Sequence, residues 1–169
     1  MNLTQEELKY LEDAKVHLTR LCEFYHLPLI NLKIDDNKLL GLTGVALFKS
    51  DENTIYLNKF CLKGSYDKKV SHEFRHYWQR EHYPSVYNWW LVEHKNLYET
   101  MKKTADEYHV QLSHKHCPLE LDAILFGNEN GNSDREDLLI QFQTGLENGI
   151  DYTSYYERIL KTEGAHIIL

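Results

Sequence analysis

The sequence predicts an α+β fold in which a small antiparallel sheet is followed by helices, and three observations lead to this class. An amphipathic segment of helical period opens the chain, three short segments of strand type follow it, and the sequence after Gly64 returns to helical period and keeps it. No internal repeat or change of composition divides the 169 residues. We therefore expect a single domain over residues 1–169, with about three strands between an N-terminal helix and several later helices.

The start of the first helix is predicted by a capping box. Thr4 and Glu7 have the spacing at which each side chain bonds the backbone of the other, and apolar residues then recur at helical spacing as far as Leu27. Strand segments are indicated by alternating or β-prone residues beside turn-prone clusters, and the second and third are expected to form a hairpin. They cover residues 30–34, 44–48 and 54–57.

Periodicity predicts five further helices. They cover residues 67–82, 85–110, 118–127, 134–147 and 151–162. The clearest loop is the segment 126–133, which is rich in Asn and Gly, and Gly127 is expected to cap the helix before it.

Composition excludes several classes of function. The chain has 19 Lys and Arg against 26 Asp and Glu, a formal charge of −7, so we expect no broad contact with nucleic acid, which depends on clustered basic residues. No apolar run approaches the roughly 18 residues of a membrane helix. The first residues lack the features of a signal peptide, and three widely spaced cysteines, Cys22, Cys61 and Cys117, suit reduced thiols. We expect a cytoplasmic protein that does not bind membranes.

The strongest chemical signal is the sequence HEFRH at residues 72–76, which matches HExxH. Histidines at positions i and i+4 of a helix leave from one face, so His72 and His76 could bind one Zn²⁺ per chain. Glu73 could then act as general base towards a water at that ion. The apolar residues of the same segment fall on the other side of the helix, as a cleft floor requires: Val70, Phe74, Tyr77 and Trp78.

The residues leave the third ligand open. Glu120 has the most distinctive context, because Pro118 suits the first turn of a helix and the small Ala123, one turn on, permits close approach of a neighbouring helix. A mixed set of histidine and carboxylate ligands favours zinc over other divalent metals. The carboxylates available on the following helices are Glu93, Glu99, Glu107 and Glu120.

Two other residues are alternatives to Glu120 as the third ligand. Glu99 follows a Trp-rich segment and is the second candidate. His82 gives the HExxHxxxxxH spacing of metzincins, but the Gly that turns the chain there is replaced by Gln79. On a helix that continues, His82 lies about 240° around the axis from His76, so the two could not reach the same ion.

A further cluster, His114-Lys115-His116-Cys117, precedes Glu120. Imidazole and thiolate are zinc ligands, so a second metal site is one interpretation. Another is that His114 or His116 enters the cleft and donates to a developing oxyanion. A polar loop that carries histidines is the plainest interpretation.

The segments VSHEFRHYWQ and PLELDAILFG together resemble the gluzincin-type metallopeptidases of the ImmA/IrrE and related phage or bacterial groups, in which a Glu of an ExxA-type helix completes HExxH. The resemblance covers residues 42–127. It implies a minimal zincin-like domain with Zn²⁺ held by His72, His76 and Glu120, and Glu73 as base. It also implies that residues 53–58 form the edge strand that pairs with an extended substrate.

The sequence thus predicts a zinc-dependent endopeptidase that acts on a protein or peptide, and by the resemblance this substrate could be a regulatory protein. The alternative is a metal-binding pseudoenzyme or protein-interaction module without proteolytic activity. A protease recruited to DNA, of SprT type, is disfavoured because the chain has neither a basic tail nor zinc-ribbon cysteines. Nothing in the sequence indicates an oligomeric state.

Overall fold

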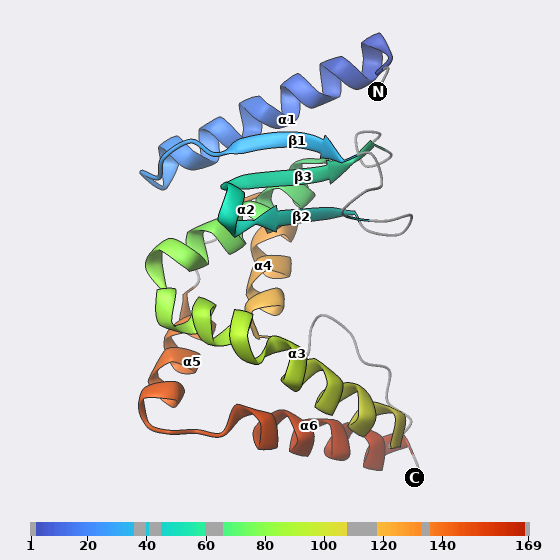
Figure 1. The fold of residues 1–169 in the computed structure, drawn as a ribbon, viewed down its shortest axis with the longest axis vertical. Helices are drawn as coiled ribbons and strands as arrows, with labels where there is room; N and C mark the ends of the chain where they lie inside the picture. The colour runs from blue at the N-terminus through green and yellow to red at the C-terminus, as the bar shows by residue number, and fades with distance from the viewer. Residues whose placement is uncertain are drawn as a thin grey trace. The chain divides into compact units, whose positions relative to one another are not determined.

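A computed structural model of the chain describes residues 3–35, 40, 45–59, 66–107, 118–132 and 136–167. Helix α1 is followed by three strands and then by five further α-helices, with the short 3₁₀ helix η1 between the second and third strands (Figure 1). The α+β class is confirmed, and every predicted helix after the strands begins within three residues of its expected start. The elements are α1 (Gln5–Phe24), β1 (Asn31–Asp35), β2 (Ala46–Lys49), η1 (Ser50–Glu52), β3 (Thr54–Asn58), α2 (Tyr66–His82), α3 (Pro84–Glu107), α4 (Pro118–Asn128), α5 (Asp137–Glu147) and α6 (Tyr152–Ile167).

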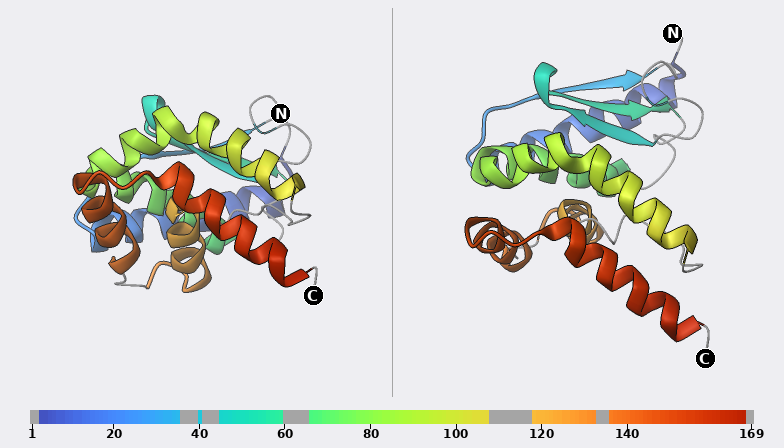
Figure 2. Two further views of the ribbon diagram at one scale, coloured as in Figure 1. Left: turned by 90° about the horizontal axis from the view of Figure 1, so that it is seen from below. Right: turned by 60° about the horizontal axis from the view of Figure 1, so that its bottom comes forward.

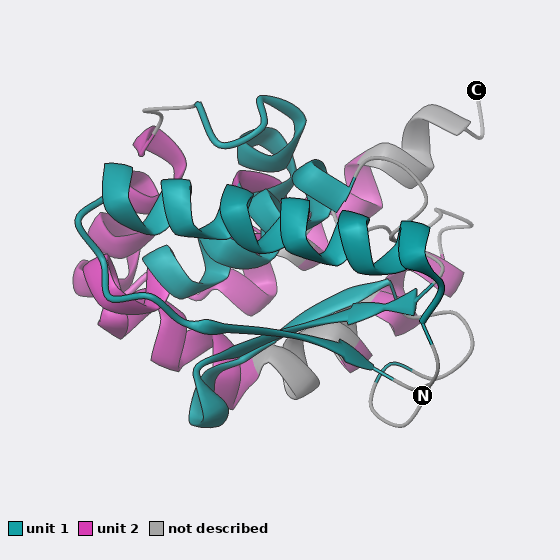
Figure 3. Cartoon of the chain, turned by 90° about the horizontal axis from the view of Figure 1, so that it is seen from above, with its two compact units in different colours: residues 1–78, 123–134 teal, residues 79–122, 135–169 magenta. Residues whose placement is uncertain are grey.

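The chain divides into two compact units (Figure 3). One comprises Met1–Trp78 and Ala123–Asp134, and the other comprises Gln79–Asp122 and Arg135–Leu169. Helices α2 and α4 each contribute residues to both units. The single domain expected over residues 1–169 stays a prediction.

The sheet of the first unit has the strand order β1-β3-β2. Strands β2 and β3 are antiparallel, with Ala46 opposite Leu57, so the predicted hairpin is confirmed. Strand β1 runs parallel to β3, with Asn31 opposite Thr54, so the sheet is mixed and the prediction of an antiparallel sheet was wrong on this point. The alternation of apolar and polar residues along a strand indicates which face is buried, but it does not indicate the direction of the neighbouring strand. The sequence therefore did not show that β1 runs parallel to β3.

The order of the strands corrects a second expectation. Residues 53–58 were expected to form the edge strand, but β3 lies in the centre of the sheet and β2 lies at an edge. The burial of β3 agrees with a central position, because Ile55 and Leu57 are fully buried. Helices α1 and α2 cover one face of the sheet (Figure 2). Lys33 and Tyr56 are opposite each other in the register of β1 and β3, and by alternation they share the other face.

The capping box of α1 is confirmed. The backbone N–H of Thr4 donates to Oε2 of Glu7 at 2.8 Å, and the N–H of Glu7 donates to Oγ1 of Thr4 at 3.2 Å. The buried stripe of the helix then fixes which face it presents to the core. Its members are Ala14, Leu18, Leu21 and Cys22.

The end of α4 corrects the role expected for Gly127. The helix continues through Gly127 to Asn128, and the chain turns at Asn130, whose φ is 53°. The N–H of Asn130 donates to the carbonyl of Gly127, and the N–H of Gly131 donates to that of Phe126, which is the bonding pattern of a Schellman cap. Gly127 is therefore not the cap, and its use lies in helix packing, as described below.

In the second unit α3 packs along α6 and contacts α5. Phe142 of α5 and Tyr152 of α6 stack with ring centroids 3.9 Å apart, and Trp89 of α3 meets Phe142 edge-on at 5.2 Å. Among the described residues no helix combines the length and the apolar character needed to cross a membrane. The cytoplasmic location stays a prediction.

Candidate metal centre

The HExxH segment lies within α2, as predicted. The apolar side of the helix is buried, with Val70 and Phe74 fully inaccessible, whereas His72 and His76 are half-buried. The two imidazoles therefore leave the helix away from its core face and remain accessible to a small ligand.

The two histidines are spaced as ligands of one ion would be. Their Nε2 atoms lie 3.2 Å apart. Two ligand atoms about 2.0–2.1 Å from a tetrahedral Zn²⁺ are separated by about 3.3 Å. In the absence of metal the same distance fits a hydrogen bond between one protonated and one bare ring nitrogen.

Helix α4 brings Glu120 to the histidines. His72, His76 and Glu120 each offer one ligand atom, and these three atoms lie within 4.8 Å of one another. All three residues are half-buried. The other candidates are placed differently, because Glu99 of α3 and His82 at the end of α2 are exposed and belong to no such group among the described residues. Glu93 and Glu107 do not join the histidines there either.

Glu73 is held by the edge strand. Its side chain is 7% exposed, and its Oε2 accepts a hydrogen bond of 2.7 Å from the backbone N–H of Phe48 in β2. The N–H of Asn58 donates to the carbonyl of Val45, so these two residues form a hydrogen-bonded pair of the antiparallel ladder. Hydrogen-bonded and non-hydrogen-bonded pairs alternate along such a ladder, which makes Phe48 and Ile55 a non-hydrogen-bonded pair. The N–H of Phe48 therefore points to the open side of β2, where Glu73 receives it. The other oxygen, Oε1, lies 4.0 Å from Nε2 of His72.

Gln79, which the sequence showed only as a departure from the metzincin pattern, joins α2 to the start of α4. It is fully buried, and its Nε2 donates to the carbonyl of Leu119 at 3.0 Å and to Oδ2 of Asp122 at 2.7 Å. Asp122 is thus turned towards Gln79. The sequence contained a signal for the place of Gln79 beside the site, because on a helix it lies only about 60° around the axis from His76, on the side of the proposed ligands.

Towards the other end of α4 the two helices approach closely. A Cβ at Gly127 would lie 2.8 Å from the carbonyl oxygen of Lys68 and 3.3 Å from Cβ of His72. The rings of Phe74 and Phe126 stack beside this contact, with centroids 6.1 Å apart. A side chain at Gly127 would therefore force α4 away from the turn of α2 that carries the first histidine.

Arg75, inside the HExxH segment, is a second residue that sequence reasoning missed. It is 1% exposed, and its guanidinium carbon lies 3.9 Å from the ring centroid of Trp78 and 4.9 Å from that of Phe126. The guanidinium thus stacks between aromatic rings of α2 and α4, a favourable cation–π arrangement. Its position between the two histidines in the sequence gives no sign of this burial.

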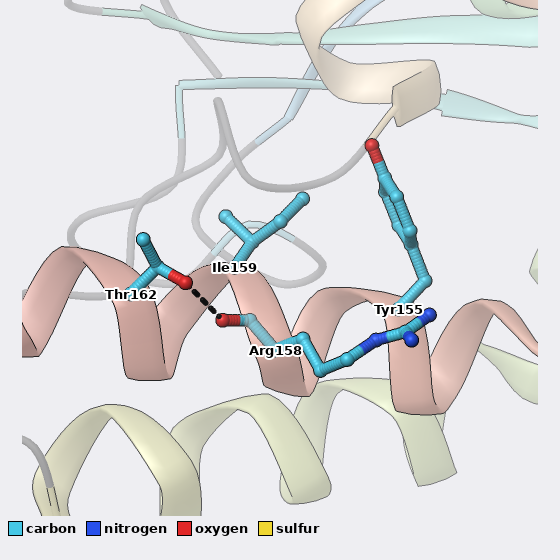
Figure 4. A pocket seen from close by; sticks show the side chains of 4 residues that line it. All are labelled: Tyr155, Arg158, Ile159 and Thr162. Carbon is cyan, nitrogen blue, oxygen red and sulfur yellow. Dashed lines mark hydrogen bonds between the residues drawn. The ribbon is translucent and has the colours of Figure 1, made fainter.

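A pocket on α6 has a different character. It is lined by Tyr155, Arg158, Ile159 and Thr162, and the hydroxyl of Thr162 donates to the carbonyl of Arg158 (Figure 4). The lining has no carboxylate, imidazole or thiol, so it offers no set of metal ligands. The predicted cluster His114, His116 and Cys117 lies outside the residues that the structure describes.

Comparison with models of protein families, with curated proteins and with solved structures finds no match to this chain. The likeness to the ImmA/IrrE group therefore depends on the two sequence segments alone.

Proposed function

We propose that the protein is a zinc-dependent metallopeptidase of minimal gluzincin type, with one Zn²⁺ per chain held by His72, His76 and Glu120. The observation that carries the proposal is the convergence of these three ligand atoms within 4.8 Å. Two imidazoles and one carboxylate are the ligand set of several catalytic zinc sites, which keep a fourth position open. A structural zinc site has four protein ligands, and the described residues offer three here.

The donor chemistry of the site fits zinc. When bound, Zn²⁺ supplies a Lewis acid that lowers the pKa of a water molecule and polarises a carbonyl group. Imidazole nitrogens with one carboxylate suit this ion better than the all-oxygen sets preferred by Mg²⁺ or Ca²⁺.

In the proposed reaction Glu73 moves the proton. The N–H of Phe48 fixes Oε2, so the carboxylate is held in one orientation and its Oε1 stays on the side of His72. At this position Oε1 can accept a proton from an attacking water and return it to the leaving amine. The hydrogen bond from the strand removes rotational freedom that the base would otherwise lose during the reaction.

Strand β2 is suited to bind an extended chain. It lies at an edge of the sheet, and although the N–H of Phe48 is taken by Glu73, the alternation of the strand turns the main-chain groups of Ala46 to the same open side. An extended peptide added to such an edge would be held by main-chain hydrogen bonds. A protein or peptide substrate is therefore part of the proposal.

The test is metal analysis of the purified protein after dialysis against a weak chelator. We expect about one zinc per chain in the wild type and in Glu99→Ala, which removes an exposed carboxylate. Glu120→Ala should lose its zinc during the dialysis, because the two remaining imidazoles bind the ion more weakly than three ligands do. Uptake of no metal by the wild type when zinc is supplied would contradict the proposal.

Activity is tested separately with a peptide library and the zinc-loaded protein. Cleavage that a chelator abolishes and zinc restores is the expected result. Full zinc occupancy without cleavage of any peptide or unfolded protein would favour the alternative, a metal-binding interaction module.

A further inference from the structure

Glu120 lies close to the N-terminal end of its helix. It is the third residue of α4, so it lies in the first turn, where backbone N–H groups have no partner within the helix. Helix ends fray unless other contacts hold them. A carboxylate in this turn reaches the histidines only if the turn itself is fixed.

The side chain of Gln79 provides such a contact. Its amide group has two N–H donors, and its nitrogen bonds the residues on either side of Glu120, namely the carbonyl of Leu119 and the carboxylate of Asp122. Gln79 is fully buried and Asp122 is 4% exposed, so water does not compete freely for these bonds. A buried hydrogen bond of this kind is costly to leave unmade.

The same helix carries both the anchor and a ligand. Gln79 follows His76 by three residues on α2, a rise of about 4.5 Å along the axis. Any shift of the first turn of α4 relative to Gln79 is therefore also a shift relative to His76. The amide thus couples the position of Glu120 to that of the histidine pair.

We infer that Gln79 is a positioning residue for the metal centre: by bonding Leu119 and Asp122 it places the Glu120 carboxylate within reach of His72 and His76. Gln79 acts through Glu120 and does not itself touch the ion. This inference rests on the proposed function, since it concerns the affinity of the same site for zinc.

The test is a double-mutant cycle on zinc affinity, measured by competition with a chelator of known affinity. The four proteins are the wild type, Gln79→Met, Glu120→Ala and the double variant. Methionine keeps the approximate length of the side chain and removes both donors. We expect Gln79→Met to weaken zinc binding by about 10- to 100-fold, the range for partners of metal ligands. In the Glu120→Ala background the same substitution should have no further effect, because the residue through which it acts is gone.

Two further variants separate positioning from folding. Tyr83→Phe removes a hydrogen bond of 2.5 Å to Glu136 just beyond the end of α2, and it should leave zinc affinity unchanged. If Gln79→Met does not fold, Gln79→Asn takes its place, because it keeps the amide but retracts it by about 1.5 Å. Thermal unfolding of each metal-free variant shows whether it is folded.

Each outcome decides the inference. Zinc affinity of wild-type strength in a folded Gln79 variant would overturn it, as would equal weakening with and without Glu120, which would indicate a general loss of stability. Different results would contradict the proposed function: the wild type would bind no zinc, or Glu120→Ala would bind zinc as tightly as the wild type. Either result would also overturn the inference about Gln79.

Discussion

The two oxygens of Glu73 have different surroundings, and this difference defines its proposed role. Oε2 is bound by the N–H of Phe48 in the edge strand, whereas Oε1 lies near His72. A hydrogen bond from a backbone group cannot be removed by changing a side chain, so it is a stable way to orient a base. A substitution at Glu73 can therefore keep the shape of the side chain and its bond from Phe48 while it removes only the basic group.

We expect Glu73→Gln to keep zinc and to lose hydrolysis. The amide oxygen of Gln can still accept from Phe48, but an amide cannot take up a proton at neutral pH. The rate of peptide cleavage should fall by about 100-fold or more, the usual contribution of a general base. Zinc content and cleavage of one peptide are measured together, with Glu81→Gln, an exposed residue of the same helix, as the control. Retained cleavage would remove Glu73 from the role of base.

His17 is expected to make the free energy of unfolding depend on pH. Its Nε2 lies 2.8 Å from Oγ of Ser71 in α2, and burial lowers the pKa of His17 below its ordinary value of 6.5, although Asp67 opposes this. Between the lowered pKa and 6.5 the unfolded chain binds a proton that the folded chain does not. The free energy of unfolding should therefore fall as the pH falls through this window, and the contribution is complete above it.

The comparison that isolates this effect is wild type against His17→Gln, both without metal. Gln stays neutral and can still bond Ser71, so its free energy of unfolding should fall less steeply between about pH 7 and pH 5. Urea unfolding at several pH values measures both slopes. Identical slopes would show that His17 titrates alike in the folded and unfolded chains.

At the scale of elements, the site depends on how α4 lies along α2. Gly127 and the stacked rings of Phe74 and Phe126 bring the C-terminal half of α4 against the turn that bears His72. Gln79 holds the first turn of α4 in the same way further along α2. Each of these contacts joins a part of α2 to a part of α4 within one of the two compact units.

We expect Gly127→Ala to destabilise the protein and to weaken zinc binding. Its Cβ would meet a backbone oxygen at 2.8 Å, which cannot rotate away, and Cβ of His72 at 3.3 Å. Overpacking of this kind costs about 1–3 kcal/mol. Urea unfolding and zinc competition measure the two effects. Asn128→Ala, at the exposed next position of α4, is the control, and a stable Gly127→Ala protein would show that the helices can separate without loss.

At the scale of the whole molecule, the proposed ligands come from two helices that lie far apart in the sequence. The set is complete only in the folded chain, so zinc should bind the folded state in preference to the unfolded state. Binding is then linked to stability through the ratio of zinc concentration to Kd.

Zinc should accordingly stabilise the protein, by about 2.7 kcal/mol at a free concentration 100 times Kd. Thermal unfolding with a zinc buffer and with a chelator measures the difference. His76→Ala, which removes one of the paired imidazoles, should lose most of this stabilisation while the unfolding of its metal-free form changes little, because His76 is only half-buried. Equal stabilisation of both proteins would show that zinc binds elsewhere.

The sequence by itself determined the elements and the central motif. Period and capping residues are local properties, so the helix beginning after Thr4, the hairpin of β2 and β3 and the placement of HExxH on α2 could all be derived from neighbouring residues. The α+β class followed from the order of these elements.

Only the tertiary structure decided what depends on contacts between distant segments. It made β1 parallel to β3, placed β2 rather than β3 at the edge, and brought the carboxylate of Glu120 rather than that of Glu99 to the histidines. It also buried Gln79 and Arg75, polar residues that a helical pattern alone would leave to solvent. The physical reason is that periodicity specifies which face of an element is apolar, whereas the partner of that face is chosen by packing across the whole chain.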